Sequence, residues 1–306
     1  MAESLDAFLR RGRVLVDEAL DRWLPKPPAC PAIVAEAMRY SVFAGGKRLR
    51  PMLTLAAAEA VDRDAAPRAL PAACAIEMIH TYSLIHDDLP AMDNDTLRRG
   101  RPTLHVVYGD GVAILAGDGL HAEAFTLLGQ TPADDPPELP RRRLRVLDVI
   151  GRAAGPAGMV GGQAIDLQAA GQVPGHAVTL DADGLRDMHA RKTGALIHAS
   201  ALSGAIIAGA DEQQAAGVAL YAREIGVAFQ IVDDVLDVEG SAAQLGKSAG
   251  KDAAAAKPTY PSLFGVDRSR ILAVECVDRA LAAIDAAGLT DGQLPAIARW
   301  VVSRRN

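Results

Sequence analysis

Residues 73–95 read ACAIEMIHTYSLIHDDLPAMDND, and the spacing of apolar and polar residues along them predicts a helix. Ala73, Ile76, His80, Ser83 and Asp87 follow one another at steps of three and four residues, which places them on one helix face. A face that starts apolar and becomes polar is expected to leave the core and border a cavity. We therefore predict a helix whose last turn opens into a cavity near Asp87.

An acidic segment, HDDLPAMDND, lies at the end of this stretch, at residues 86–95. Its four carboxylates repel one another unless a cation lies between them. Pro90 is expected to end or bend the helix near Asp88. In a straight helix Asp87 and Asp93 would lie about 120° apart, whereas the bend lets both carboxylates converge on one ion. Taken alone, the segment is also compatible with a polar turn capped by aspartates.

A second acidic segment, QIVDDVLD, lies at residues 230–237. Asp233 and Asp237 are four residues apart on one helix face, and Gln230 lies one turn earlier on that face. Two acids on an otherwise apolar helix are unfavourable unless they bind cations. Ligand sets made of oxygen suit Mg²⁺ rather than zinc, and Mg²⁺ completes its shell with water and phosphate oxygens. The two segments together predict a phosphorylated substrate held between them.

Basic residues accompany both acidic segments. The turn GGKRLRP at residues 45–51 presents three cations within four residues, although a solvated helix start is the alternative interpretation. Arginine forks match phosphate oxygens in pairs, and lysine acts as a point charge. Acids that bind metal beside bases that bind oxygen predict a diphosphate site. The other candidate cations are Arg98, Arg99, Lys192, Lys247, Lys251 and Lys257.

The composition of the 306 residues predicts an all-α protein with a single domain, 1–306. Half of the residues are hydrophobic, and the abundant Ala and Leu favour helices, whereas strand-like alternation is hard to find. A helical stripe runs from Val218 to Val235. Three loop-like segments, 131–140, 171–183 and 239–258, are each flanked by helical patterns, so none is expected to link two domains.

The charge and the apolar segments of the chain disfavour several classes of protein. A net charge of −6 argues against nucleic-acid binding. Cys30, Cys74 and Cys276 lack metal-ligand spacing and are expected to be reduced. The first residues lack the apolar region of a signal peptide, and the weakly polar stretch 195–210 is shorter than the ~20 residues of a membrane span. We expect a soluble, cytoplasmic protein without a membrane span.

Four segments together resemble the trans-isoprenyl diphosphate synthases, the polyprenyl synthetase family. They are GGKRLRP, HDDLPAMDND with the LRRG that follows it, the KTG triplet at 192–194 and FQIVDDVLD, in the family's order. The likeness covers residues 40–265, and the form of the first motif is similar to that of bacterial farnesyl and plant geranylgeranyl enzymes. It implies a bundle of mostly antiparallel helices around a deep central cavity, and a homodimer.

The resemblance also implies the reaction and the residues that perform it. Prenyl transfer would join isopentenyl diphosphate to an allylic partner, dimethylallyl or geranyl diphosphate, while about three Mg²⁺ ions stabilise the diphosphate that leaves. The implied metal ligands are Asp87, Asp88, Asp93, Asp233 and Asp237, with Asp234 and Lys192 also in the catalytic set. The residues implied to bind the allylic diphosphate are Arg98, Lys192 and Lys257, and Thr193, Gln230 and Lys247 complete the substrate-binding set. The residues implied to bind isopentenyl diphosphate are Lys47, Arg50, His80 and Arg99.

Product length is expected to depend on the cavity floor below the first acidic segment. Tyr82, five residues before Asp87, resembles the aromatic residue that limits farnesyl synthases, so we favour farnesyl over geranylgeranyl diphosphate as the product. Ser83 is the competing floor residue, because it shares the Asp87 face while Tyr82 lies ~140° away on an ideal helix. The GGKRLRP segment disfavours a terpene cyclase, which binds no second diphosphate. A non-catalytic subunit is disfavoured because neither motif lacks an acid.

Overall fold

Helix α4 (Ala66–Asp87) contains the predicted helix and carries the first acidic segment at its end. The computed structural model describes residues 3–130, 135–239 and 259–304. Helix α4 ends at Asp87, three residues before Pro90, as the sequence predicts. Ala73 and Ile76 are fully buried, whereas His80, Ser83 and Asp87 line a cavity. The prediction that this helix face passes from core to cavity is confirmed.

The other elements form a bundle that is almost entirely helical, which confirms the all-α prediction. Before α4 come α1 (Leu5–Trp23), α2 (Ala32–Val42) and α3 (Leu49–Val61). After it come α5 (Leu104–Tyr108), α6 (Asp110–Gly129), α7 (Leu139–Ala154), α8 (Met159–Ala169) and α9 (Ala182–His189). The last elements are η1 (Ala190–Gly194), α10 (Ala195–Ala208), α11 (Glu212–Glu239), α14 (Tyr260–Phe264), α15 (Val266–Ala286) and α16 (Leu294–Ser303).

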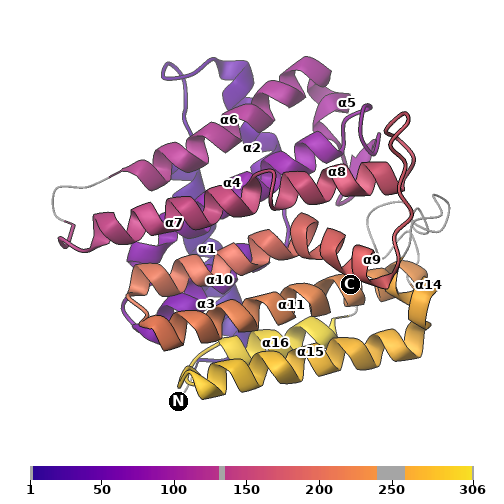
Figure 1. The fold of residues 1–306 in the computed structure, drawn as a ribbon. Coiled ribbons are helices and arrows are strands. Elements are labelled where there is room, and N and C mark those ends of the chain that lie inside the picture. The colour runs from indigo at the N-terminus through magenta and orange to yellow at the C-terminus, as the bar shows by residue number, and fades with distance from the viewer. Residues whose placement is uncertain (1–2, 131–134, 240–258, 305–306) are drawn as a thin grey trace.

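The long helices lie roughly side by side, in layers that run from α6 to α15 (Figure 1). Helix α4 packs against α6 and α3, α10 packs against α3 and α7, and α11 packs against α10 and α15. Helix α10 approaches α3 closely at Gly204, where an added Cβ would lie only 2.0 Å from the Thr54 carbonyl oxygen. The buried hydrophobic side chains of these layers form a continuous cluster.

Short elements interrupt the helical pattern at two places that matter for the site. Strands β1 (Leu97–Arg98) and β2 (Arg101–Pro102) form an antiparallel hairpin behind the first acidic segment. The segment η1 is a π-helical turn between α9 and α10. Neither was predicted, because each is too short to produce a periodic pattern in the sequence.

Each predicted loop overlaps the end of a neighbouring helix by one or two residues, and most of the helical stripe is buried as predicted. Residues 171–181 lie outside any helix, and α7 begins at Leu139 inside the predicted loop 131–140. The predicted loop 239–258 begins at the last residue of α11, and 240–258 fall outside the described residues. Along α11, Val218, Tyr221 and Val235 are buried as the stripe predicts. By length and composition alone, α6 and α11 could each cross a membrane, but α11 packs between α10 and α15 as a core helix does.

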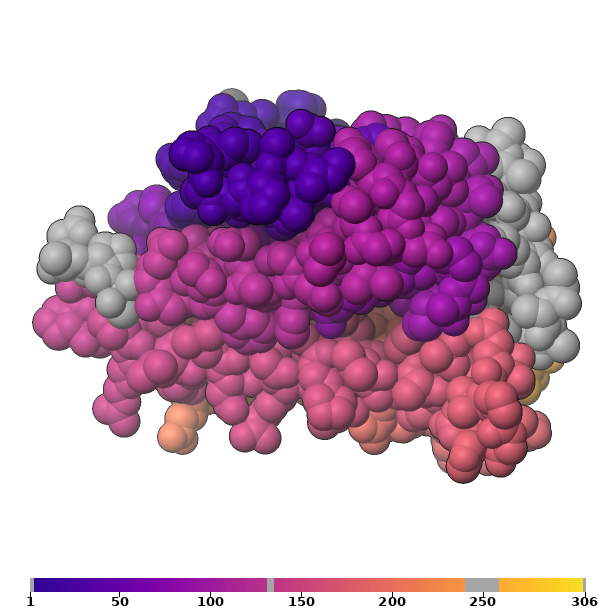
Figure 2. Space-filling model, turned by 90° about the horizontal axis from the view of Figure 1, so that it is seen from above, coloured from indigo at the N-terminus to yellow at the C-terminus, as the bar shows by residue number. Residues whose placement is uncertain are grey.

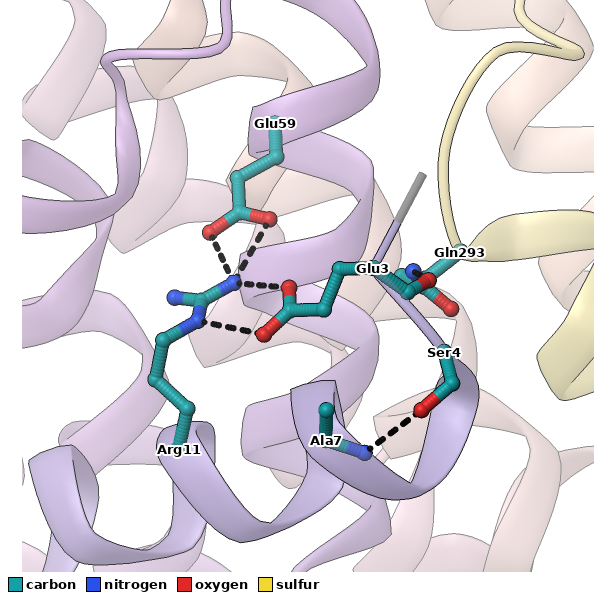
Figure 3. Close-up of polar contacts among 6 residues, drawn as sticks. All are labelled: Glu3, Ser4, Ala7, Arg11, Glu59 and Gln293. Atoms are coloured by element: carbon teal, nitrogen blue, oxygen red, sulfur yellow. Dashed lines mark hydrogen bonds and ion pairs between the residues drawn. The ribbon is translucent and has the colours of Figure 1, made fainter. Parts of the chain in front are cut away.

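Polar contacts attach the N-terminal segment to the bundle (Figure 3). The Arg11 guanidinium of α1 bonds both carboxylate oxygens of Glu3, at 3.1 and 2.9 Å, and also reaches Glu59 of α3 at 3.1 Å. The amide of Gln293 donates to the Glu3 carbonyl at 2.7 Å. These contacts join the start of α1 to the end of α3 and to the start of α16.

Candidate active site

The first acidic segment folds back on itself where α4 ends. The amide of Asp93 donates to the Asp87 carbonyl at 2.9 Å, and the amide of Asp95 donates to the Asp88 carbonyl at 3.2 Å. Asn94 takes a left-handed conformation, with φ of 51°, which asparagine tolerates better than most residues do. The bend after Asp88 therefore exists, and it returns Asp93 to the neighbourhood of Asp87.

The acids of this segment have different surroundings. Burial raises the pKa of Asp87 to about 6, and this effect exceeds the opposing pull of Lys192, while Asp93 adds repulsion. Asp88 is 4% exposed and forms a bidentate ion pair with Arg98, whose Nε and Nη2 lie 2.9 and 2.6 Å from Oδ1. Asp87 is thus the acid that lines the cavity, whereas Asp88 fixes the arginine of the β-hairpin.

The second acidic segment also divides into two groups of side chains. Asp233 and Asp237 line a cavity, as expected for groups one turn apart. Asp234 is 4% exposed and accepts hydrogen bonds from the Gln230 side chain at 2.8 Å and the Tyr260 amide at 3.0 Å. Gln230 shares the helix face of Asp233 and Asp237 by spacing, but its side-chain amide bonds Asp234, four residues on.

Two adjoining cavities separate these acidic segments. The first has a volume of about 420 Å³ and a mostly apolar lining, and Asp87 and Lys192 are among its few charged groups. The second, of about 460 Å³, is lined by charged side chains of α3 and α11. Arg50 and His80 line both cavities. Volumes of this size suit small-molecule substrates.

Arg50 and His80, which form the wall shared by the two cavities, favour the binding of an anion. Burial lowers the pKa of Arg50 to about 10, so its guanidinium is still charged at neutral pH, and its buried Nε lacks a hydrogen-bond partner among the described residues. Burial and the nearby Arg50 and Arg99 lower the pKa of His80 well below its usual range, which keeps the imidazole neutral. A buried cation with an unused donor is unfavourable unless an anion binds beside it.

All three cations of the glycine-led turn border the second cavity, but the charge of Arg48 is already paired. Arg48 is 5% exposed, and its guanidinium donates hydrogen bonds to the carboxylates of Glu77 at 2.7 Å and Asp17 at 3.0 Å. Lys47 and Arg50 line the cavity. Arg99 joins them there from the β-hairpin, and its guanidinium donates to the Gly45 carbonyl.

Lys192 and Thr193 reach the first cavity from the π-helical turn η1. The Lys192 ammonium bonds Asp166 of α8 at 2.6 Å. Gln163, one turn before Asp166, also lines this cavity, and its buried Nε2 lacks a partner in the described structure. Turns of π-helix occur often at functional sites, because the extra residue redirects side chains.

The sequence analysis missed three residues of the site. Gln163 and Asp166 belong to the segment GGQAID at 161–166, where two polar groups at helical spacing follow a glycine pair. Arg304 stands just beyond α16, lines the second cavity and bonds Asp233 at 2.9 Å. The position of Arg304 gave no signal, since a basic residue near a chain end is normally solvated. Lys247 and Lys257 fall outside the described residues, so their predicted roles stay predictions.

Tyr82 and Ser83 both line the first cavity, below Asp87 on α4. The Tyr82 ring lies 4.8 Å from the ring of His121 on α6 and 5.6 Å from that of His86, measured between centroids. Tyr82 is therefore supported from behind by α6, which suits a wall.

The oxygen ligands in this site fit Mg²⁺. Asp87 lines the first cavity, with Asp93 folded back beside it, while Asp233 and Asp237 line the second. Within the described residues no three histidine, cysteine or acidic side chains form a ready-made metal site. Mg²⁺ commonly uses one or two carboxylates and takes its other ligands from water and substrate phosphate. The raised pKa of Asp87 shows the unfavourable charge that a cation would relieve.

Comparisons with known proteins agree with this geometry. The profile of the family described as polyprenyl synthetase matches residues 31–282. The chain is 46% identical to a farnesyl diphosphate synthase of Geobacillus stearothermophilus, over 93% of this chain and 94% of the relative. It is 43% identical to a geranylgeranyl diphosphate synthase of Cyanophora paradoxa, over 99% and 97% of the two chains.

Solved structures give the same result. The crystal structure of an FPP/GFPP synthase from Zymomonas mobilis, in its apo form, superimposes with a TM-score of 0.81 at 38% identity. The match covers 97% of this chain and 98% of the other. The chain therefore resembles these relatives in sequence, and the solved structure in fold, over nearly their whole length.

Proposed function

This chain belongs to the polyprenyl synthetase family, and we propose that it is the family member that makes farnesyl diphosphate. Its activity is that of a trans-prenyl diphosphate synthase, which joins isopentenyl diphosphate to an allylic diphosphate and releases diphosphate. The observation that carries the farnesyl assignment is the Tyr82 ring, which lines the apolar cavity and is supported by His121. A relative that makes farnesyl diphosphate at 46% identity supports it further.

The two cavities take different substrates in this proposal. The allylic chain lies in the first cavity, with its diphosphate at the level of Asp87 and Lys192. Isopentenyl diphosphate lies in the second, where Lys47, Arg50 and Arg99 supply positive charge. The apolar lining of the first cavity excludes water from the carbon that becomes cationic.

The acids and bases of the site act on the leaving group. Asp87, Asp93, Asp233 and Asp237 would hold Mg²⁺, which when bound supplies charge stabilisation to the departing diphosphate. Lys192 and Arg98 stabilise the same negative charge from the protein side, and Asp88 keeps Arg98 in place. The isopentenyl double bond attacks the allylic carbon, and a proton then leaves the new chain for the released diphosphate.

A geranylgeranyl product is the second candidate, because a relative at 43% identity carries that name. One measurement separates the two products: purified protein is incubated with isopentenyl diphosphate, each allylic diphosphate in turn and Mg²⁺, and product length is determined by chromatography. We expect farnesyl diphosphate. A mainly geranylgeranyl product would overturn the farnesyl assignment, and full turnover in the presence of EDTA would overturn the metal assignment.

We further propose a homodimer formed through α5 and α6, in the cytoplasm. Large apolar side chains are exposed there, including Val106 at 50% and Leu115 at 57%. Helix α6 forms part of one broad face of the molecule (Figure 2). Exposed apolar groups that gather on one face mark an interaction surface, and a second copy would also cover the outer side of His121.

A further inference from the structure

Lys192 lies between two carboxylates that have different partners. Its ammonium is 2.6 Å from Oδ2 of Asp166, which is 6% exposed. Asp87 lines the same cavity, but among the described residues no ion pair joins it to Lys192. Burial lowers the pKa of Lys192, yet the charges of Asp166 and Asp87 outweigh this and raise it, so the ammonium is permanently charged at neutral pH. Where the ammonium points therefore decides which of the two acids it neutralises.

Helix α8 holds Lys192 at two points on one face. Gly162 and Asp166 are four residues apart, so they lie one above the other. At Gly162 an added Cβ would lie 2.2 Å from the Lys192 amide nitrogen and 2.7 Å from its Cα. The backbone of α8 thus contacts the backbone of η1, while Asp166 bonds the end of the same side chain. A flexible lysine is fixed at both its base and its tip.

We propose that Asp166 is a positioning residue that holds the Lys192 ammonium away from Asp87. Asp87 then stays open to a cation, and Lys192 stays directed at the diphosphate. The proposal rests on the proposed function, since it assumes that Asp87 takes part in binding a metal–diphosphate complex. Asp166 is not among the residues that line the first cavity, and the effect proposed for it passes through Lys192.

Without Asp166, the carboxylates that still attract the Lys192 ammonium are Asp87 and, more weakly, Asp93. The ammonium would then compete with metal for these acids, Asp87 first. A purely structural role predicts something different: loss of a buried ion pair lowers stability and leaves metal binding unchanged once the protein is folded. Metal binding therefore separates the two roles, and activity alone does not.

The test measures binding of Mn²⁺ together with inorganic diphosphate, followed by electron paramagnetic resonance, on protein shown to be folded by circular dichroism. Asp166→Asn should weaken Mn²⁺ binding by about three- to tenfold, a typical coupling between neighbouring charged groups. Asp187→Asn is the matched control, because Asp187 pairs with Arg191, next to Lys192, in an exposed contact of 2.8 Å. It should bind Mn²⁺ as the wild type does.

The double variant Asp166→Asn, Lys192→Gln isolates the route of the effect. With no ammonium to compete for Asp87, adding Asp166→Asn to Lys192→Gln should cause no further loss of Mn²⁺ binding. Gly162→Ala keeps both charges but forces α8 away from η1, so it should weaken binding in the same direction. It serves in place of Asp166→Asn if that variant does not fold.

Three results would overturn the proposal. One is wild-type Mn²⁺ binding by Asp166→Asn, or by Gly162→Ala if the first variant does not fold. Another is an undiminished effect of Asp166→Asn in the Lys192→Gln background. The third, failure of the wild type to bind Mn²⁺ with diphosphate, would also overturn the proposed metal-dependent function, and this distinguishes it from the other two.

Discussion

At the scale of single residues, the site combines groups that a folded protein normally avoids burying. Asp87, Arg50 and His80 each lose favourable hydration, and their pKa values move accordingly. Such shifts concentrate where a ligand supplies the missing charge. Replacing such a residue should therefore make the ligand-free protein more stable and the enzyme less active.

Asp87 provides the clearest case. Its folded pKa of about 6 lies above the ordinary value of 3.8, so the folded state takes up a proton that the unfolded state releases. The stability from that proton is complete below pH 3.8 and is lost as the pH rises through 6. In EDTA at pH 7.5, Asp87→Asn should raise the free energy of unfolding by about 1–3 kcal/mol, and turnover should fall by orders of magnitude.

The measurement is thermal unfolding of both proteins at pH 7.5 and at the lowest pH at which both remain folded. The gain in melting temperature should be a few degrees at pH 7.5 and smaller at the lower pH. An equal gain at both pH values would mean that the carboxylate is not poorly solvated in the folded protein.

Tyr82 tests the assignment of product length. Replacing its ring by alanine should open the end of the apolar cavity, because a close-packed wall stops a chain where no void is left. Tyr82→Ala should then lengthen the product beyond farnesyl diphosphate with little change in the first condensation, as measured by chromatography. Ser83→Ala is the comparison, and a longer product from Ser83→Ala alone would assign the floor to that residue.

Lys47 and Arg50 test the assignment of the second cavity. Lys47→Ala should raise KM for isopentenyl diphosphate much more than KM for the allylic substrate, since only the second cavity is changed. Arg50→Ala should affect both substrates, because Arg50 lines both cavities. Steady-state kinetics with each substrate varied in turn gives the comparison. Equal effects of Lys47→Ala on both constants would mean that the lysine serves another site.

At the scale of elements, the two acids of the pair Asp233–Asp234 belong to different parts of the protein. Asp233 lines the second cavity, whereas Asp234 accepts a hydrogen bond from the first residue of α14. Asp234→Ala should lower the free energy of unfolding by about 1–3 kcal/mol, since it leaves buried donors unsatisfied. Asp233→Ala should lower turnover with a smaller effect on stability. Chemical denaturation of both variants tests this, and equal destabilisation would contradict it.

Most of the long helices could be predicted from the sequence, because the signals that form and end a helix lie within the helix itself or close to its ends. The 3,4 spacing of α4 and α11 and the position of Pro90 are local signals, and they gave the helices and the end of α4. The turn η1 and the pairing of Gln230 with Asp234 were missed, because a π-helical turn and the rotation of one side chain leave no periodic trace. The motif acids were found because charge on an apolar helix is unusual wherever it occurs.

At the scale of the whole molecule, what could not be predicted is which distant segments meet. Asp166 reaches Lys192 from 26 positions away, and Arg304 reaches Asp233 from the last described residue. Both contacts follow from the packing of α8 and α16, which no short stretch encodes. The single domain, the homodimer and the cytoplasmic location are still predictions.

The homodimer can be tested by introducing one charge. Leu115 is 57% exposed on α6, so Leu115→Lys should not disturb the core. It should weaken self-association, because an ammonium would be buried in an apolar interface. Analytical ultracentrifugation over a range of concentrations should show dimer for the wild type and a shift to monomer for the variant. Leu144→Lys, at 67% exposure on α7, is the matched control, and an equal shift in that variant would contradict the α6 interface.

The wall formed by Arg50 and His80, which borders both cavities, has a consequence for repeated condensation. Each new chain carries the diphosphate that entered with isopentenyl diphosphate, so in the proposed arrangement every intermediate would be formed with its head group on the far side of that wall. To be extended again, the intermediate must move its diphosphate past Arg50 and His80 into the first cavity, or else dissociate and rebind. Under this proposal, passage of the head group past these two side chains would compete with dissociation, and that competition would set how much of the shorter intermediate is released.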